Sequence, residues 1–296
     1  MNKIFAVTIL TMLFSGCSKN FTHNQLVPIS FKAIVNMTTK APITTVDNLE
    51  PIQVLRAPDH ATDAVYLSLS TPTLTGTIDA SGNVTPSAIQ YYNANNSLNS
   101  WFMAFYPEAT SIGSGVATFT VNGSHDLIYA PSISAGSKLS PNAAFSFAFV
   151  HKLAQINVNV IAENAAAVIG WGTVNSIKIN TATVLDLDID GTGTGTLAAN
   201  VTPVLTDLQT LNASDAAVSD IVLTTSNQDM GSLMILPGTN ITLKINTIAG
   251  NEAVNIGTIE AGKAYTINLT FKLTEITFKA TLTDWADGGT TGHDVQ

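Results

Sequence analysis

The chain has a single cysteine, Cys17, among its 296 residues. One thiol excludes an internal disulfide and any metal site built from several thiolates. Charged residues are also scarce, at 11% of the sequence, and Arg56 is the only arginine. Because Lys and Arg number 12 against 21 acidic residues and form no basic cluster, nucleic acid is excluded as a partner. The fold must therefore be held together by sheet pairing and packing.

The sequence also lacks the motifs of common catalytic and cofactor sites. It has no HExxH, no GxSxG and no P-loop, and its five histidines show no ligand spacing. Residues 186–194, DLDIDGTGT, begin like a calcium loop, but Leu197 stands where that loop needs a bidentate Glu. We interpret these aspartates as the solvated face of a strand and His151 as a hydrogen-bonded structural histidine. We expect no enzyme activity, no metal and no other cofactor.

The N-terminus has the pattern of an export signal. Lys3 is followed by the apolar run IFAVTILTMLF, which is too short to span a bilayer and suits a secretory signal peptide over residues 1–16. The following LFSGC resembles the bacterial lipobox, whose cysteine is acylated and becomes the first residue of the mature chain. We therefore predict lipid attachment, such as palmitate, at Cys17. Each buried methylene contributes ~0.8 kcal/mol, so the acyl chains would keep the protein on a membrane until it is cut.

The remaining sequence is rich in strand signals. Short stretches of alternating polarity are separated by turn clusters such as DASGN at 79–83 and IAGNE at 248–252. Apolar residues make up 45% of the chain, which is enough for a sizeable core. The length after residue 16 and the short, regularly spaced strands favour an all-β fold of two tandem β-sandwich domains, over residues 41–162 and 163–296. Residues 153–161 would be the last strand of the first domain, and 162–168 the linker or the start of the second.

A well-formed strand lies close to the N-terminus. Residues 29–42 read ISFKAIVNMTTKAP, which places Ile29, Phe31 and Ala33 on one side of an extended chain. The strand is followed by Lys40 and Ala41, a bond that a trypsin-like protease could cut.

The C-terminal run is the most regular part of the sequence. Apolar residues alternate up to Leu273, and the phase then changes after Glu275. Because neither Gly nor Pro marks this change, we predict a β-bulge or a strand that crosses from one sheet to the other. The last strand would then belong to a different surface from the strand before it.

The order of these features resembles the fimbrillins, the type V pilins and pilus-related lipoproteins of anaerobic gut and oral bacteria. Besides the lipobox and the first strand, the resemblance rests on motifs spread over nearly the whole chain. These motifs are WFMAFYPEAT at 101–110, HDLIYA at 125–130, FAFVHKLAQINVNV at 147–160, MILPGTNITLKI at 234–245 (shortly after Gly231 and Ser232), IEAGKAYTINLTFK at 259–272 and TLTDW at 281–285.

The resemblance implies that the two β-sandwich domains are transthyretin-like with Greek-key topology. It also implies a structural role and brings no catalytic residues. In such pilins the lipoprotein reaches the outer membrane, a protease cuts after a basic residue, and the first strand leaves with the lipid. The emptied groove then accepts a strand from a neighbouring subunit of the surface fimbria, which supports adhesion. In this sequence the lipidated segment with the removable strand would span residues 17–40. Lys40 occupies the position usually held by arginine, with the cut before Ala41, and Arg56 is the second candidate.

The implied partners are other pilin subunits in a homo- or hetero-polymer, the processing protease, the outer membrane through the lipid, and host or bacterial surface ligands. The candidate donor strand comprises Ile276, Phe278, Ala280, Leu282 and Trp285. An ordinary last strand of the second domain is the alternative for this segment. A second function also stays open: a surface lipoprotein that does not polymerise and binds glycan or host protein through residues 91–100, YYNANNSLNS, or an anchor or tip accessory subunit.

Overall fold

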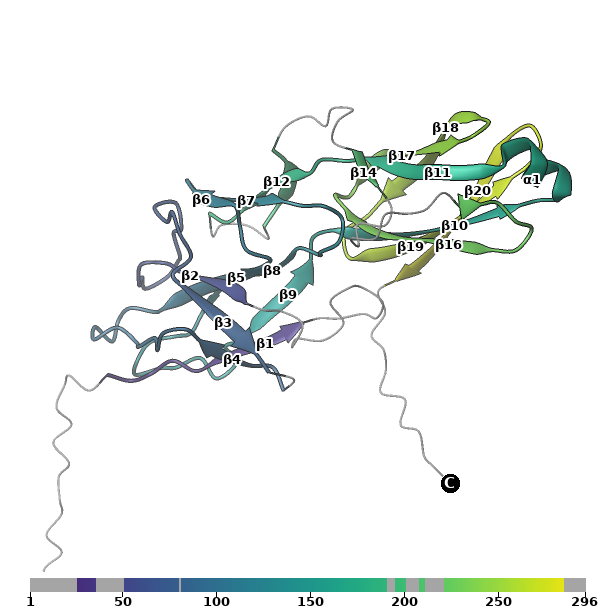
Figure 1. The fold of residues 1–296 in the computed structure, drawn as a ribbon. Coiled ribbons are helices and arrows are strands. Elements are labelled where there is room, and N and C mark those ends of the chain that lie inside the picture. Colours follow the sequence, from purple (N-terminus) through teal and green to yellow (C-terminus); the bar gives the residue numbers. More distant parts are fainter. Residues whose placement is uncertain are drawn as a thin grey trace, which may run out of the picture.

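The structure is a computed structural model that describes residues 26–35, 51–79, 81–190, 195–200, 208–210 and 221–284. In this part of the chain nearly all regular structure is β-strand, joined by one short helix (Figure 1). The all-β fold class expected from the sequence is confirmed. None of the described helical structure is long and apolar enough to cross a membrane.

Seven strands of the N-terminal half form a closed barrel in the order β1-β4-β3-β2-β5-β8-β9. Their bounds are β1 (Phe31–Val35), β2 (Ile52–Arg56), β3 (Leu74–Ile78), β4 (Asn83–Pro86), β5 (Trp101–Tyr106), β8 (Ile128–Ser134) and β9 (Phe147–His151). Alternate side chains fill the interior, among them the fully buried Ile52, Val54, Phe102 and Ala104. Packing inside the barrel therefore depends on every strand of the closed path.

A four-stranded sheet covers part of the barrel's outer surface. Its order is β13-β12-β7-β6, with bounds β6 (Ser111–Gly113), β7 (Val116–Thr120), β12 (Val184–Asp188) and β13 (Leu197–Ala199). A second core, which includes Met103, Phe105 and Phe119, lies between the two layers. β12 thus pairs with β7 of the N-terminal part and β13 pairs with β12, although the division predicted at residue 163 assigns both strands to the C-terminal domain.

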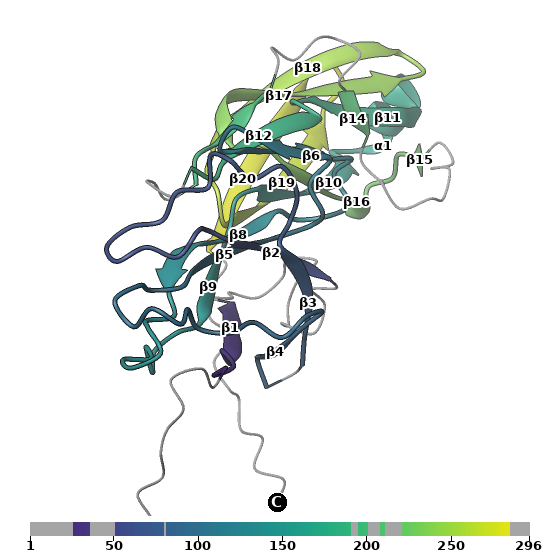
Figure 2. The ribbon, with the colours of Figure 1, turned by 90° about the vertical axis from the view of Figure 1, so that its left-hand side faces the viewer.

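The C-terminal half is a sandwich of two sheets, which lies beyond one end of the barrel (Figures 1 and 2). One sheet has the order β16-β10-β19-β20, and the other has the order β14-β11-β17-β18, with β15 also paired to β11. The bounds are β10 (Ala154–Ala162), β11 (Thr173–Asn180), β14 (Leu208–Thr210), β15 (Ile221–Val222), β16 (Gln228–Ile235), β17 (Gly238–Thr247), β18 (Gly250–Ile259), β19 (Lys263–Phe271) and β20 (Ile276–Asp284). A third apolar core fills the space between the sheets.

The strand predicted at residues 153–161 is present as β10, but its partners differ from the prediction. β10 lies between β16 and β19 in the sandwich, and not at the end of the N-terminal domain. Ile156, Val158 and Val160 point into the sandwich core, and alternation alone cannot tell which sheet a strand joins. Residues 165–171, at the predicted linker, form helix α1 (Ala165–Trp171), which Asn164 caps by accepting a hydrogen bond from the Ala167 N–H at 3.0 Å.

The predicted bulge or sheet crossing near Glu275 is wrong. β19 and β20 are the two arms of an antiparallel hairpin, in which Phe271 lies opposite Ile276. The four residues between them form the turn, closed by a hydrogen bond from Lys272 N–H to Glu275 C=O at 2.8 Å. The phase change in the sequence is this reversal of direction, which needs neither Gly nor Pro here. β20 therefore stays in the same sheet as β19.

Candidate functional site

The first strand closes the barrel with two different partners. Its first half pairs antiparallel with β4, where Phe31 lies opposite Val84. Its second half pairs in parallel with β9, where Ala33 lies opposite Phe147. Figure 2 shows β1 between these two edges. Without β1, both β4 and β9 would lose a strand neighbour and the barrel would open.

The side chains of this first segment alternate between the interior and the solvent. Ile29, Phe31 and Ala33 are 5%, 4% and 2% exposed, whereas Ile34 is 53% exposed. The predicted half-buried strand is therefore confirmed for residues 29–34. Its inward side chains are part of the barrel core, so the strand contributes packing as well as backbone hydrogen bonds.

An aromatic pocket surrounds Phe31. The ring centroids of Phe102, Phe145 and Phe147 lie 5.0, 5.5 and 6.0 Å from that of Phe31. Phe102 and Phe145 make edge contacts, and Phe147 is stacked. Such ring pairs contribute about 0.5–1.5 kcal/mol each beyond the area that they bury. We call these three rings, together with the backbone edges of β4 and β9, the β1 groove.

A glycine allows the backbone to pass close to β1. Ala33 N–H donates to Gly82 C=O at 2.7 Å. A Cβ built on Gly82 would lie only 2.4 Å from the Ala33 carbonyl oxygen, and Gly82 has a φ of 77°. Any side chain there would both strain the backbone and push the strand away. The groove is thus tight around the position of Ala33.

The pairing of this segment extends beyond β1 itself. Ile29 N–H donates to Gln90 C=O at 2.8 Å, and Tyr92 N–H donates to Val27 C=O at 3.0 Å. Pro28 and Tyr91 form the bridge between these bonds. Residues 90–92 are therefore a third pairing edge, at the end of the groove where the chain enters.

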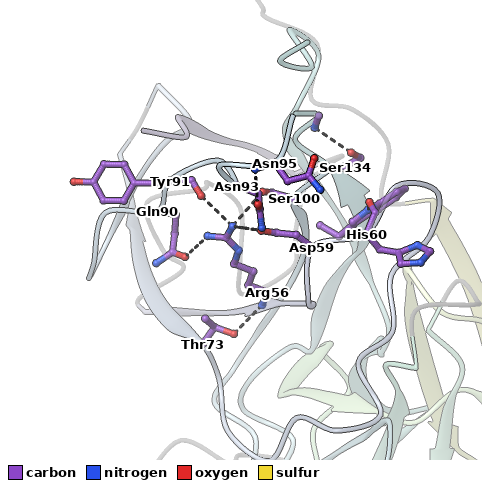
Figure 3. Close-up of polar contacts among 12 residues, drawn as sticks. Arg56, Asp59, His60, Thr73, Gln90, Tyr91, Asn93, Asn95, Ser100 and Ser134 are labelled. Atoms are coloured by element: carbon purple, nitrogen blue, oxygen red, sulfur yellow. Dashed lines mark hydrogen bonds and ion pairs between the residues drawn. The ribbon is translucent and has the colours of Figure 1, made fainter. Parts of the chain in front are cut away.

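The arginine predicted as the second cleavage candidate holds this edge in place (Figure 3). Arg56, the last residue of β2, donates from Nη2 to both carboxylate oxygens of Asp59 at 3.0 Å. The same nitrogen donates to Tyr91 C=O at 3.0 Å and to Ser100 Oγ at 3.1 Å, while Nη1 donates to Gln90 Oε1 at 3.0 Å. We call these five residues the Arg56 cluster.

The Arg56 cluster also touches the aromatic pocket. The guanidinium carbon lies 5.4 Å from the centre of the Phe102 ring, within the range of a cation–π contact. Asn93 Nδ2 donates to Asp59 Oδ2 at 2.9 Å, so the following loop is tied to the same carboxylate. The lone arginine therefore links β2, the 90–92 edge and the pocket that holds Phe31.

The loop proposed for glycan contact uses many of its polar groups internally. Asn93 Oδ1 accepts from Asn95 N–H at 2.8 Å, and Asn95 Oδ1 accepts from Ser97 N–H at 3.0 Å. Tyr92 OH donates to Ala135 C=O at 3.2 Å. These bonds shape residues 91–100 as a self-supported loop on the end of the barrel.

The candidate donor strand is an edge strand. β20 pairs along its whole length with β19, and among the described residues it has no strand on its other side. Ile276 is half-buried against the sandwich core, whereas Ala280 is exposed and Leu282 is 49% exposed. Phe278 lies opposite Leu269 in the register. In this structure the segment is thus the last strand of its own sandwich, held mainly by one neighbour.

Several predicted positions lie outside the described residues. These are the lipid attachment site Cys17, the cleavage positions Lys40 and Ala41, and Trp285 of the donor segment. In the sequence, Lys40 falls between β1 and β2, whereas Arg56 is part of β2. Neither alternation nor motif spacing indicates the contact of Gly82 with β1, the aromatic pocket or the Arg56 cluster, because pairing partners cannot be inferred from alternation within one strand.

His151 and Asp186 both form hydrogen bonds within the fold. His151 bonds through Nδ1 to the fully buried Asp126, as a structural histidine would, and burial raises the pKa of Asp126. Asp186 accepts from Thr118 Oγ1 at 2.7 Å and from Asn200 Nδ2 at 2.7 Å. No three His, Cys, Asp or Glu side chains in the described ranges are arranged to hold a metal ion.

Comparison with known proteins identifies the family. A family model described as fimbrillin-like matches residues 39–285. The chain belongs to the fimbrillin-like family. No curated protein matches the sequence. The resemblance seen in the sequence motifs is therefore confirmed by a match to most of the chain.

Solved structures with the same fold come from gut bacteria. A protein of Bacteroides uniformis, proposed to act in cell adhesion, is 17% identical with a TM-score of 0.58; the match covers 88% of this fimbrillin-like chain and 99% of that protein. A fimbrial protein of Bacteroides vulgatus is 15% identical with a TM-score of 0.59, over 87% of this chain and 99% of that one. At these identities the likeness establishes the fold alone.

Proposed function

We propose that this fimbrillin-like chain is a subunit of a surface fimbria that joins its neighbours by strand exchange and supports adhesion. It is exported as a lipoprotein attached through Cys17 and is cut between Lys40 and Ala41. The released first strand leaves an open barrel, which a strand of another subunit completes. The observation that carries this proposal is the position of β1, which alone closes the barrel between β4 and β9.

Removal of β1 would leave backbone groups unpaired and an apolar pocket unfilled, and both favour binding of a replacement strand. The edges of β4 and β9 would present unpaired N–H and C=O groups, which is a template for strand addition. The pocket of Phe102, Phe145 and Phe147 would lose the ring that fills it. Burying one large apolar side chain contributes about 1.5–3 kcal/mol, so several such anchors and a backbone ladder make a durable joint.

The strand order favours a cut at Lys40 over a cut after Arg56. A cut at Lys40 separates β1 from β2 and releases only the first strand. A cut after Arg56 would also detach β2, which pairs with β3 and β5 and whose last side chain is bound in the Arg56 cluster. Ala57, on the far side of that bond, is buried and donates to Trp101 C=O at 3.1 Å. We therefore assign processing to Lys40.

The proposed location and partners follow from the same steps. Acyl chains on Cys17 hold the precursor on the outer membrane, and the cut frees the subunit to enter a fibre at the cell surface. Its partners are the processing protease and other fimbrial subunits. Proteins of the same fold that are described as fimbrial or cell adhesion proteins support this setting. The role is structural, and no catalytic step is assigned to the chain.

The N-terminal residue of the protein recovered from cells tests the proposal. Mass spectrometry should find a mature chain that begins at Ala41, and Lys40→Ala should leave the protein acylated and unpolymerised. Lys32→Ala is the matched control, because Lys32 is an exposed lysine of the same segment and should leave processing unchanged. Fibres built from chains that still begin with acylated Cys17 would overturn the proposal.

A further inference from the structure

Two lysines that are far apart in the sequence lie side by side on the C-terminal sandwich. Lys178 of β11 is directly opposite Lys244 of β17 in an antiparallel pair. The adjoining residues Ile177 and Ile245 are buried in the sandwich core, so both lysines point to the outer face of their sheet. β11 and β17 belong to the opposite layer of the sandwich from β10 and β19 (Figure 1).

The pairing of these two lysines is unfavourable by itself. Side chains directly opposite each other on neighbouring strands have Cβ atoms about 4.5–5.5 Å apart, and like charges at such positions destabilise a sheet. Protection of a sheet edge, a common use of lysine, does not explain the pair. The order β14-β11-β17-β18 places both lysines on inner strands. Local departures of this kind from the rules of stability are typical of positions that have a function.

Among the described residues, neither lysine takes part in an ion pair. In the register, the next positions across the sheet hold Ala253 beside Lys244 and Thr210 beside Lys178, and both are neutral. Both lysines are half-buried, and the whole chain has a net charge of −9. Two adjacent ammonium groups without a carboxylate beside them favour binding of an anion from outside the chain.

The two lysines border a hollow of about 340 Å³ on this face. A second row of side chains crosses the same three strands, with Ser176 opposite Asn246 and Asn246 opposite Asn251. Neighbouring rows on one face of a sheet are about 6.6 Å apart along the strands. Ala253, which continues the lysine row on β18, ends at its Cβ and leaves space beside Lys244.

Glu252 also borders the hollow, but its register directs its side chain elsewhere. It lies opposite Ile245, whose side chain is buried in the core, so the carboxylate belongs to the inner side of the sheet. The second row on the outer face consists of one hydroxyl and two amides. The described lining of this face therefore offers hydrogen-bond donors and acceptors together with positive charge and no negative charge.

From this arrangement we infer that the outer face of β11, β17 and β18 binds an acidic polysaccharide, whose sugars carry carboxylate or sulfate groups. The ammonium groups of Lys178 and Lys244 both donate to one acidic group, since a single anion can be reached from two neighbouring strands. Ser176, Asn246 and Asn251 bind hydroxyl groups of the sugar beside it.

The composition of the site favours a glycan over other polyanions. Nucleic acids owe their affinity to many phosphate contacts, and two lysines supply too few. Amide and hydroxyl side chains, which both donate and accept hydrogen bonds, match the hydroxyl groups of a sugar chain. The inference rests on the proposed function for its adhesive setting and adds the class of ligand. It does not require strand exchange, because this sheet and β1 lie on opposite sides of the molecule (Figures 1 and 2).

Binding of the uncut chain to chondroitin sulfate, which carries both carboxylate and sulfate groups, tests the site. Lys178→Gln and Lys244→Gln should each raise the Kd roughly tenfold, because each removes one charge-assisted contact. Lys272→Gln is the matched control. It makes the same change in net charge, but Lys272 already binds Glu275 at 3.2 Å, so the Kd should change little. Unchanged affinity when Lys178 and Lys244 are both replaced would overturn the inference.

The melting temperature separates a binding role of the lysines from a structural one. Lys178→Gln and Lys244→Gln should each leave it unchanged or raise it by up to about 3 °C, because repulsion between like charges is relieved. A fall of several degrees in both variants would mean that the lysines stabilise the sheet. That result would contradict the inference that binding explains their pairing.

A carboxylate introduced beside the lysines should block the site. Ala253→Glu places its side chain opposite Lys244, where it can pair with the ammonium group that would otherwise bind the ligand. We expect the Kd to rise roughly tenfold. Ala253→Gln has nearly the same shape without the charge and should weaken binding less. Equal losses of affinity would show that space and not charge controls binding, which would contradict the role of the lysine pair.

Three comparison ligands identify the class that is bound. Chondroitin without sulfate keeps the carboxylates, dextran is a neutral polysaccharide, and a DNA duplex is a polyanion without free sugar hydroxyl groups. Binding of chondroitin sulfate above dextran and DNA supports the inference, and the unsulfated chain then shows which acidic group is recognised. Equal binding of dextran or DNA, or no binding of any of these ligands, would overturn it. Because the measurements use single uncut chains, these outcomes are independent of whether processing at Lys40 and strand exchange occur.

Discussion

A single guanidinium nitrogen of Arg56 donates hydrogen bonds to both carboxylate oxygens of Asp59, at 3.0 Å each. The side chains of the pair are only 19% and 11% exposed. The only arginine of the chain is thus a structural residue of the barrel end, bound to the segment that pairs with the residues before β1. This contact connects the groove to the rest of the fold and leads to the first prediction.

Arg56→Lys should lower the free energy of unfolding by about 2 kcal/mol. A lysine is a single donor group and cannot reach Asp59, Gln90 and Tyr91 together, so a largely buried carboxylate loses part of its pairing. Urea denaturation measures the change. Lys32→Ala, the loss of an exposed cation, is the control and should change stability by less than about 0.5 kcal/mol. Equal effects of the two variants on the free energy of unfolding would contradict a stabilising role for the hydrogen bonds of Arg56.

Gly82→Ala should destabilise the chain by about 1–3 kcal/mol and loosen β1. The new Cβ would meet the Ala33 carbonyl oxygen, and the positive φ adds backbone strain. Hydrogen exchange should show faster loss of protection at Ala33 N–H than at the amides of β19. Gly113→Ala is the matched control, since a Cβ there meets nothing within 4 Å. A loss of protection that is uniform over both halves of the molecule would argue against a local effect.

Phe31 and Arg56 should be energetically coupled through Phe102, which both contact. In a double-mutant cycle of Phe31→Leu and Arg56→Lys, we expect a coupling of about 0.5–1 kcal/mol. Phe119 belongs to the separate core outside the barrel, so the pair Phe119→Leu and Arg56→Lys should be additive. The measurement is the free energy of unfolding of each single and double variant. If the effects of Phe31→Leu and Arg56→Lys were also additive, Phe102 would not couple these two residues.

Stability should fall in alkaline solution because of Tyr66. Burial raises the pKa of this phenol far above its ordinary value, and its OH lies 3.0 Å from Ser132 Oγ. The unfolded chain loses the proton near pH 10, while the folded chain keeps it, so the folded state binds more protons and loses stability as pH rises beyond about 10. Tyr66→Phe should flatten this decline, at a cost of about 1 kcal/mol at neutral pH for the lost hydrogen bond.

Ultraviolet absorbance provides an independent measurement of the ionisation of Tyr66. Burial also raises the pKa of Tyr129, so these two phenols should remain un-ionised until the chain unfolds. A titration at alkaline pH should therefore show tyrosinate absorbance in two steps, the second coinciding with loss of the β-sheet circular dichroism signal. A single step for all six tyrosines, completed while the protein is still folded, would be incompatible with their burial.

Alternation in the sequence predicts strands well and their partners poorly. It identifies residues 29–34 and 154–161, because each places apolar side chains on one face. It does not reveal that β1 pairs in parallel with β9, more than a hundred residues away, or that β10 joins the C-terminal sheet. Pairing is decided by packing between segments that are distant along the chain, which no local pattern contains.

The candidate functional site could likewise be predicted from the sequence only in part. From the sequence, a lone arginine near a predicted strand is a reasonable protease site, and only the fold reveals that its donors are already used. The turn at residues 272–275 lacks the Gly or Pro that usually marks a hairpin, so the sequence alone predicts a bulge where the chain in fact reverses.

In the proposed mechanism, the peptide chain between β1 and β2 decides a competition governed by mass action. While the chain is uncut, its own first strand is held beside the groove at an effective concentration on the order of millimolar, which a strand on another molecule would not reach. After the proposed cut this covalent link would be gone, and a donor strand of another subunit would meet little competition. A single peptide bond would thus control when assembly begins.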